Sequence, residues 1–164
     1  MRSNTKRIAL GGMLAAVSIV IMCFGGLIPV ATYVSPMLCC MIQFVVLRLC
    51  GRRIAWTWFF VVCILSLLMS PDKESGMVFV AIGCYPMFKP MFEKVTISVL
   101  LKLSYFNISI FAVYSCMICL MGMRELAAEN VEFGLIGFAL ILVLGNATFL
   151  LLDKLLSIMD KRFQ

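Results

Sequence analysis

Few side chains in this 164-residue sequence are of the types that catalyse reactions, and their spacing does not join them into a site. The sequence has no histidine. Cys116 and Cys119 have the spacing of a redox or metal pair, but they lie inside an apolar run without a second pair. There is also no phosphate-binding loop, no Ser/His/Asp set and no helix with paired carboxylates. We therefore predict no catalytic residue, no metal and no cofactor.

Two groups of polar side chains are suited to binding a small solute instead, where broken helices meet an aqueous face. The first group lies in expected outer loops and comprises Thr32, Tyr33, Ser35, Asp72, Lys73 and Glu74. The second group lies in or beside later apolar runs and comprises Tyr85, Pro86, Lys89, Asn107, Tyr114 and Asn146. Among these, we predict that the tyrosines, the charged residues and Asn146 contact the substrate.

Each of these predictions has a structural alternative. A buried amide needs partners, so Asn146 can form a hydrogen bond between helices instead of binding a ligand. The outer loop can be a solvated turn in which Asp72 caps the next helix. Lys89 can extend along apolar surface until its ammonium group reaches the cytoplasmic interface.

The elements that would position these residues are membrane-spanning helices. The chain is 63% hydrophobic and 13% charged, more apolar than a soluble domain of this length. A helical span needs about 20 residues. We predict a single all-α transmembrane domain over residues 1–164, with six spans at about residues 8–28, 36–49, 54–69, 76–90, 95–121 and 133–152.

The breaks between spans follow from glycine, proline and charge. We expect a loop over residues 31–35, with Pro36 starting the second helix. Gly51 suits the helix terminus between the second and third spans. The fourth run is short, and Pro86 and Pro90 should kink or end it.

The basic residues determine the orientation. If the N-terminus is cytoplasmic, the six spans place all of the 14 Lys and Arg residues inside except Lys73 and Arg124. Both termini are then cytoplasmic. The net charge of +6 comes from short clusters between apolar runs, so we predict a lipid bilayer and no nucleic acid as the partner.

The first span contains four small residues, Gly11, Gly12, Ala15 and Ala16. They form two overlapping pairs spaced four residues apart, a pattern that lets a second helix approach backbone to backbone. This stripe can bind another protein or pack against a helix of the same chain, and the sequence leaves both possibilities open.

The chain resembles the substrate-binding S components of energy-coupling-factor transporters. The likeness covers the layout of six spans, residues 5–10 (TKRIAL), the small residues of 11–16 (GGMLAA), the loop with Pro29 and Pro36, and the segments 70–74 (SPDKE) and 83–90 (GCYPMFKP). In that family an Ala-x-x-x-Ala motif on the first helix packs on a transmembrane T subunit. The resemblance assigns this role to Gly12 and Ala16.

The resemblance implies a receptor in the bacterial cytoplasmic membrane that binds a vitamin-like micronutrient on its outer side. A T subunit and two ATPase subunits would then drive release inside. Members that take up nickel or cobalt use an N-terminal histidine site, which this sequence lacks. The alternative is a non-transporting scaffold that resembles the small membrane subunits of cell-wall elongation machinery.

Overall fold

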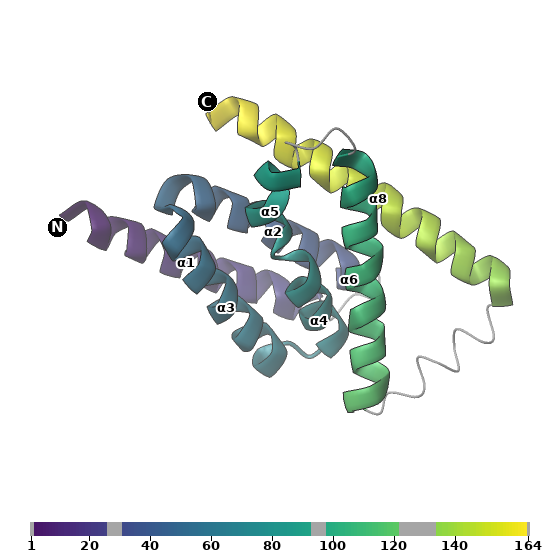
Figure 1. The fold of residues 1–164 in the computed structure, drawn as a ribbon. Coiled ribbons are helices and arrows are strands. Elements are labelled where there is room, and N and C mark those ends of the chain that lie inside the picture. Colours follow the sequence, from purple (N-terminus) through teal and green to yellow (C-terminus); the bar gives the residue numbers. More distant parts are fainter. Residues whose placement is uncertain (1, 26–30, 93–97, 122–133, 164) are drawn as a thin grey trace. The chain divides into compact units, whose positions relative to one another are not determined.

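The structure, a computed structural model, describes residues 2–25, 31–92, 98–121 and 134–163, and within them every regular element is an α-helix. This confirms the predicted all-α class. The helices are α1 (Arg2–Gly25), α2 (Ala31–Cys50), α3 (Arg52–Met69), α4 (Lys73–Ile82), α5 (Tyr85–Phe92), α6 (Ser98–Met121) and α8 (Gly134–Phe163), labelled in Figure 1. They fall into two compact units, residues 1–94 (unit 1) and residues 95–162 (unit 2).

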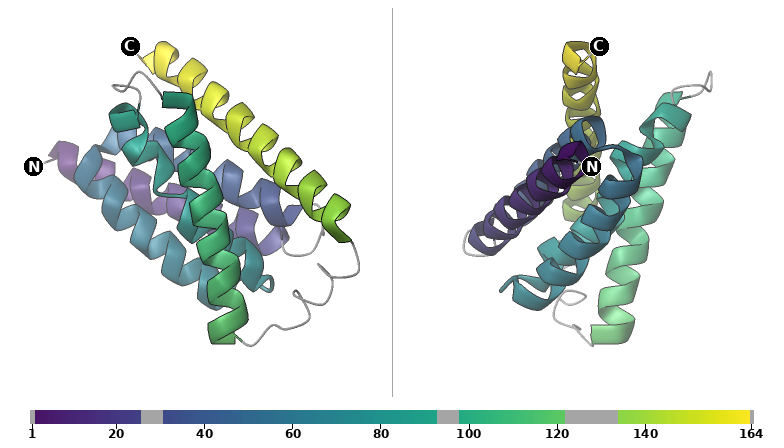
Figure 2. Two further views of the ribbon diagram at one scale, coloured as in Figure 1. Left: turned by 45° about the vertical axis from the view of Figure 1, so that its right-hand side comes forward. Right: turned by 90° about the vertical axis from the view of Figure 1, so that its left-hand side faces the viewer.

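In unit 1, helices α1, α2 and α3 run in alternating directions (Figures 1 and 2). At one end the Cys50 thiol, at the end of α2, lies 3.3 Å from the Arg7 carbonyl oxygen near the start of α1. At the other end the Ser70 hydroxyl, after α3, lies 3.5 Å from the Met22 carbonyl oxygen. Helix α2 is central, because it packs against α1, α3, α4 and α5.

The turn between α2 and α3 is a single glycine, as predicted. Gly51 has φ of 92°, a left-handed conformation that glycine adopts without steric cost. Its carbonyl oxygen accepts the backbone N–H of Ala55 at 3.0 Å, which starts α3. The tight turn brings Arg52 and Arg53 to the same end of unit 1 as Arg7.

The predicted start of the second helix is wrong. Helix α2 begins at Ala31 instead of Pro36, so residues 31–35 are helical and Pro36 lies inside the helix. Proline lacks an N–H, but the first four N–H groups of a helix have no intrahelical partner in any case. Because Pro36 lies just beyond that first turn, the helix loses only the bond to the Thr32 carbonyl.

The fourth apolar run, predicted as one span over residues 76–90, is divided into α4 and α5 by Gly83 and Cys84. Pro86 has no N–H for the Ile82 carbonyl, which explains why the helix ends there. Gly83 is required by close packing, since an added Cβ would lie 2.6 Å from the Phe79 carbonyl oxygen and 2.8 Å from Phe59 Cε2. The run is therefore interrupted near Pro86, as predicted, whereas Pro90 lies inside α5, which continues to Phe92.

Unit 2 contains α6 and α8. Helix α8 extends to Phe163, beyond the predicted end of the sixth apolar run at residue 152. This extension of α8 contains the charged residues Asp153, Lys154, Asp160 and Lys161.

Two of the described helical segments, Thr5–Gly25 and Arg52–Met69, are long and apolar enough to cross a membrane. Only 28% of the most apolar stretch of the first and 33% of that of the second are buried. Shorter apolar segments cover Val34–Cys50 and Val99–Val113.

Candidate functional site

The four small residues of α1 are divided between two faces of the helix. Gly11 and Ala15 face inward: Ala15 is 8% exposed, and a Cβ on Gly11 would lie 3.5 Å from Ile54 Cγ2 on α3. Gly12 and Ala16 are exposed, and no heavy atom of the described chain lies within 4 Å of a Cβ placed on Gly12. One small pair therefore serves packing within unit 1, while the other is left on the surface.

Large apolar side chains surround the exposed pair. We call this surface the outer α1 face, and its members are Ile8, Gly12, Met13, Ala16, Val20 and Phe24. Met13 is 69% and Phe24 is 66% exposed. Two exposed small residues thus lie among bulky exposed ones on this face, a pattern that suits the close approach of another apolar helix.

Of the predicted outer-loop residues, Asp72, Lys73 and Glu74 lie at the junction of α3 and α4, where Asp72 and Lys73 cap the two helices. Asp72 Oδ1 accepts the backbone N–H of Glu74 at 2.9 Å, which makes Asp72 the N-cap of α4. Lys73 Nζ donates to the carbonyl oxygens of Leu67 at 2.7 Å and Ser70 at 3.2 Å, at the negative end of α3. The capping alternative is therefore present in the structure. Asp72 Oδ2, which is buried, has no hydrogen-bond partner among the described residues.

Two other predicted contacts, Tyr85 and Lys89, are buried on α5. The Tyr85 side chain is 0% exposed, and its ring stacks on Phe92 with centroids 6.4 Å apart. Lys89 is 3% exposed. Tyr33 lies in the first turn of α2 and Tyr114 lies on α6, but the side chains of both are outside the described residues.

Asn146, the remaining predicted contact, pairs with Asn107 across unit 2. Each amide nitrogen donates to the other side chain's oxygen, at 3.2 Å from Asn107 Nδ2 and 3.1 Å from Asn146 Nδ2. Asn107 also donates to the Leu103 carbonyl at 3.0 Å. The hydrogen bond between helices, which the sequence left as the alternative, is therefore present.

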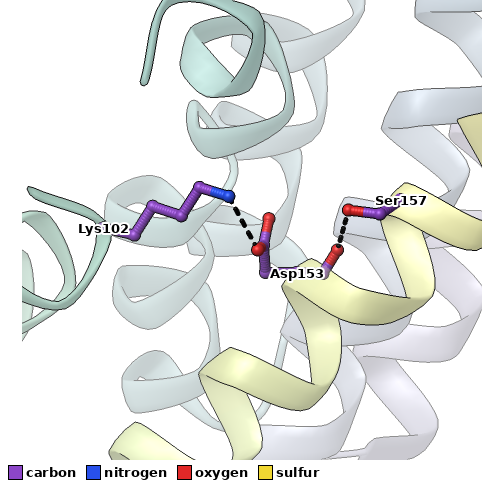
Figure 3. A network of polar contacts seen from close by, with 3 residues as sticks. All are labelled: Lys102, Asp153 and Ser157. Atoms are coloured by element: carbon purple, nitrogen blue, oxygen red, sulfur yellow. Dashed lines mark hydrogen bonds and ion pairs between the residues drawn. The ribbon is translucent and has the colours of Figure 1, made fainter. Parts of the chain in front are cut away.

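An ion pair joins the same two helices nearer the end of α8 (Figure 3). Lys102 Nζ lies 2.8 Å from Asp153 Oδ2, and these side chains are 7% and 15% exposed. The Ser157 hydroxyl donates to the Asp153 backbone carbonyl at 2.9 Å. Between the two polar pairs, Phe106 stacks on Phe149 with centroids 4.7 Å apart. We call the contacts Lys102–Asp153, Phe106–Phe149 and Asn107–Asn146 the α6–α8 seam.

The sequence interpretation missed the ion pair. A signal was available, because Lys102 lies five residues before Asn107 while Asp153 lies seven after Asn146. If the asparagines pair across antiparallel helices, the charges must meet about two turns away.

The sequence interpretation also missed two buried polar side chains inside unit 1, Gln43 and Trp58. Gln43 on α2 is 0% exposed, and neither of its amide atoms has a hydrogen-bond partner in the described part of the chain. The same holds for the indole nitrogen of Trp58 on α3, a residue that is 4% exposed. The available signal was a single glutamine within a long apolar run.

One hollow of unit 1 lies near the Gly51 turn and has a volume of about 270 Å³. Its lining comprises Arg52, Met87, Phe88, Pro90 and Met91. None of the predicted substrate contacts lines it. The structure places the described contacts of unit 1 at the α3–α4 junction and on α5, and the described contact of unit 2, Asn146, on the α6–α8 seam.

No protein-family model, curated protein or solved structure matches this chain. The functional argument therefore rests on three features of the residues themselves. These are the outer α1 face, the α6–α8 seam and the buried polar groups of unit 1.

Proposed function

We propose that the chain is a multi-pass protein of the bacterial cytoplasmic membrane, with six spans and both termini in the cytoplasm. The main support is the surface of α1 and α3, where most of the apolar stretch is exposed. A core helix of a soluble protein would bury such a stretch, since exposed apolar area costs about 25 cal/mol per Å² in water. In a bilayer the same surface faces lipid at no such cost.

The distribution of charge in unit 1 supports this orientation. The end that holds the Gly51 turn carries Lys6, Arg7, Arg48, Arg52 and Arg53. The opposite end carries Asp72, Lys73 and Glu74, in which acidic residues outnumber basic ones. Since cytoplasmic segments are enriched in Lys and Arg, the first end is the cytoplasmic one and the α3–α4 junction faces outward.

Within this framework, the proposed function is that of a substrate-binding S component of an energy-coupling-factor transporter. It would bind a vitamin-like micronutrient from outside and deliver it through a T subunit with two ATPase subunits. The observation that carries the proposal is the outward position of Gly12 and Ala16 on an apolar face, while Gly11 and Ala15 already serve internal packing. Association between membrane helices depends on such small residues.

The proposal is tested by replacing Gly12 with leucine and purifying the tagged protein from its native membranes. Wild type should retain T and ATPase subunits and a small molecule detectable by native mass spectrometry. Gly12→Leu should lose the subunits and keep the small molecule. The matched control is Met13→Leu. It changes an exposed side chain on the same face and leaves the small side chains at Gly12 and Ala16 unchanged.

Two results would refute the proposal: wild type that retains neither ATPase subunits nor a small molecule, or Gly12→Leu protein that assembles as wild type does. The alternative function, a scaffold of envelope machinery, is favoured by the capping bonds of Asp72 and Lys73, which occupy two of the predicted substrate contacts. A scaffold would keep its protein partners without gaining thermal stability from any small molecule.

A further inference from the structure

Gln43 is the polar side chain of unit 1 that its fold explains least. Its residue is 0% exposed, yet among the described residues neither Oε1 nor Nε2 has a hydrogen-bond partner. An amide that gives up water without gaining a partner destabilises the fold. A methionine or leucine of similar volume would avoid this cost. The amide is therefore a feature that folding alone does not require.

Trp58 places a second such group at the same depth. Its indole N–H lacks a partner in the described ranges, and the residue is 4% exposed. An α-helix rises about 1.5 Å per residue. Measured along the helix axis from the Gly51 turn, Gln43 is therefore about 12 Å away in α2, and Trp58 is about 10 Å away in α3. Since α2 packs against α3, the two polar groups lie at one level of unit 1.

The break between α4 and α5 lies beside this level. Cys40, one turn from Gln43 on the same face of α2, has the thiols of Cys63 on α3 and Cys84 at the break within electrostatic range. Phe79, four residues before Gly83, holds its ring 6.4 Å from that of Trp58 in an edge-to-face contact. Discontinuous helices inside membranes are found where backbone is buried in protein or lines a cavity.

We propose that Gln43 and Trp58, together with the Gly83–Cys84 break, form a buried binding site for a neutral, planar, amide-containing ring. This inference rests on the proposed receptor function and names the substrate class. Because Gln43 is completely covered, a ligand would reach it when α5 moves relative to α4 at the break.

The ligand class follows from the groups on offer. Gln43 presents one acceptor and two donors, and Trp58 presents one donor. Adjacent C=O and N–H groups, as in a lactam, cyclic urea or carboxamide, would satisfy both side chains. A neutral edge is favoured because desolvating an ion is far more costly than desolvating an amide. The rings of Trp58, Phe59 and Phe79 suit a flat partner.

The experiment uses the fluorescence of Trp58. Trp56→Phe removes the other tryptophan of the chain, which leaves Trp58 as the reporter in the full-length purified protein. The probes are uracil and benzamide, each paired with its N-methylated analogue, 1,3-dimethyluracil or N,N-dimethylbenzamide, which keeps the ring and loses the N–H donors. We expect at least one unmethylated probe to shift the Trp58 emission and its methylated analogue not to do so.

Gln43→Met in the same background is the decisive variant, since it keeps the volume and removes the amide. It should fold at least as well as its parent and bind the effective probe roughly 10-fold or more weakly. The inference is overturned if neither unmethylated probe shifts the emission, or if Gln43→Met binds as its parent does. Should Gln43→Met not fold, Trp58→Phe, followed by equilibrium dialysis of radiolabelled probe, decides in the same way.

This outcome is separable from that of the receptor proposal. If wild type and Gln43→Met retain the same small molecule on purification, the chain is a receptor whose ligand lies elsewhere. If Gln43→Met loses that molecule while its ATPase subunits remain, both proposals stand. If wild type retains neither, the receptor proposal itself has failed.

Discussion

The α6–α8 seam and the interior of unit 1 treat polar side chains in opposite ways. Along the seam, Lys102 pairs with Asp153 and Asn107 pairs with Asn146. Inside unit 1, Gln43 and the Trp58 indole have no partner within the described residues. Polar groups that pair with each other hold two helices in register, whereas polar groups left without partners lower stability unless something else binds them.

This contrast predicts whether each substitution lowers or raises the stability of the protein. Removing one member of a satisfied pair should destabilise the protein, because it leaves the other member buried and alone. Removing a group that has no partner should leave stability unchanged or raise it. Three substitutions test this difference and a fourth, Gly11→Leu, tests the packing of α1; they follow from the largest expected effect to the smallest.

Asp153→Leu should have the largest effect. It leaves the Lys102 ammonium, 7% exposed, without its carboxylate, a change that costs about 3–5 kcal/mol when a buried pair loses one partner. Unfolding in mixed micelles with increasing denaturant measures the loss. The double variant Lys102→Met/Asp153→Leu should recover most of it, and a double variant as unstable as the single one would show that the pair is not coupled.

Gly11→Leu should lower the free energy of unfolding by about 1–3 kcal/mol, because Ile54 Cγ2 lies only 3.5 Å from the position of an added Cβ. Thermal unfolding in detergent measures this. The matched control is Gly12→Leu, whose Cβ meets no described atom within 4 Å and which should unfold as wild type does. Equal losses at both positions would mean that both faces of α1 are packed, and that the outer α1 face is not a free surface.

Asn146→Leu should destabilise unit 2 by about 1 kcal/mol, the usual size for a hydrogen bond between membrane helices. The Asn107→Leu/Asn146→Leu double variant should be close to wild type, since no amide is then left alone. The same denaturant titration measures both. If the receptor ligand binds Asn146, the single variant will also lose affinity for it, and this would move Asn146 from a structural to a binding role.

Gln43→Met should have the smallest effect on stability, and in the opposite direction. Its free energy of unfolding should be unchanged or raised by up to about 1 kcal/mol. Trp58→Phe provides a comparison for the second unpartnered group. If Gln43→Met lowered the free energy of unfolding by more than 1 kcal/mol, Gln43 would be a side chain whose partners stabilise the fold, like those of the seam. The contrast between the two regions would then be lost.

Several features were predictable from the sequence because they depend on local chemistry. Gly51 marks a helix terminus because only a residue without a side chain adopts φ of 92° readily. Pro86 marks the end of α4 because it cannot donate the next helical hydrogen bond. Asp72 was recognised as a possible N-cap from its place before an apolar run, and it occupies that position.

Other features depended on which distant segments meet, and the sequence left these open. Small residues four apart mark a face where helices can approach, but whether that face is filled depends on the position of Ile54 in α3. Lys102 and Asp153, 51 residues apart, form an ion pair only because α6 and α8 pack together. The neighbours of the predicted substrate contacts are likewise set by packing.

The amino-acid sequence alone determined that this chain is helical, where several of its helices end, and which end of each carries charge, because these depend on residues within one or two turns of each other. Only the tertiary structure decided which of the two small pairs of α1 faces inward, and which buried polar groups have partners. A hydrogen bond or a close contact between helices is fixed by positions that no local pattern specifies.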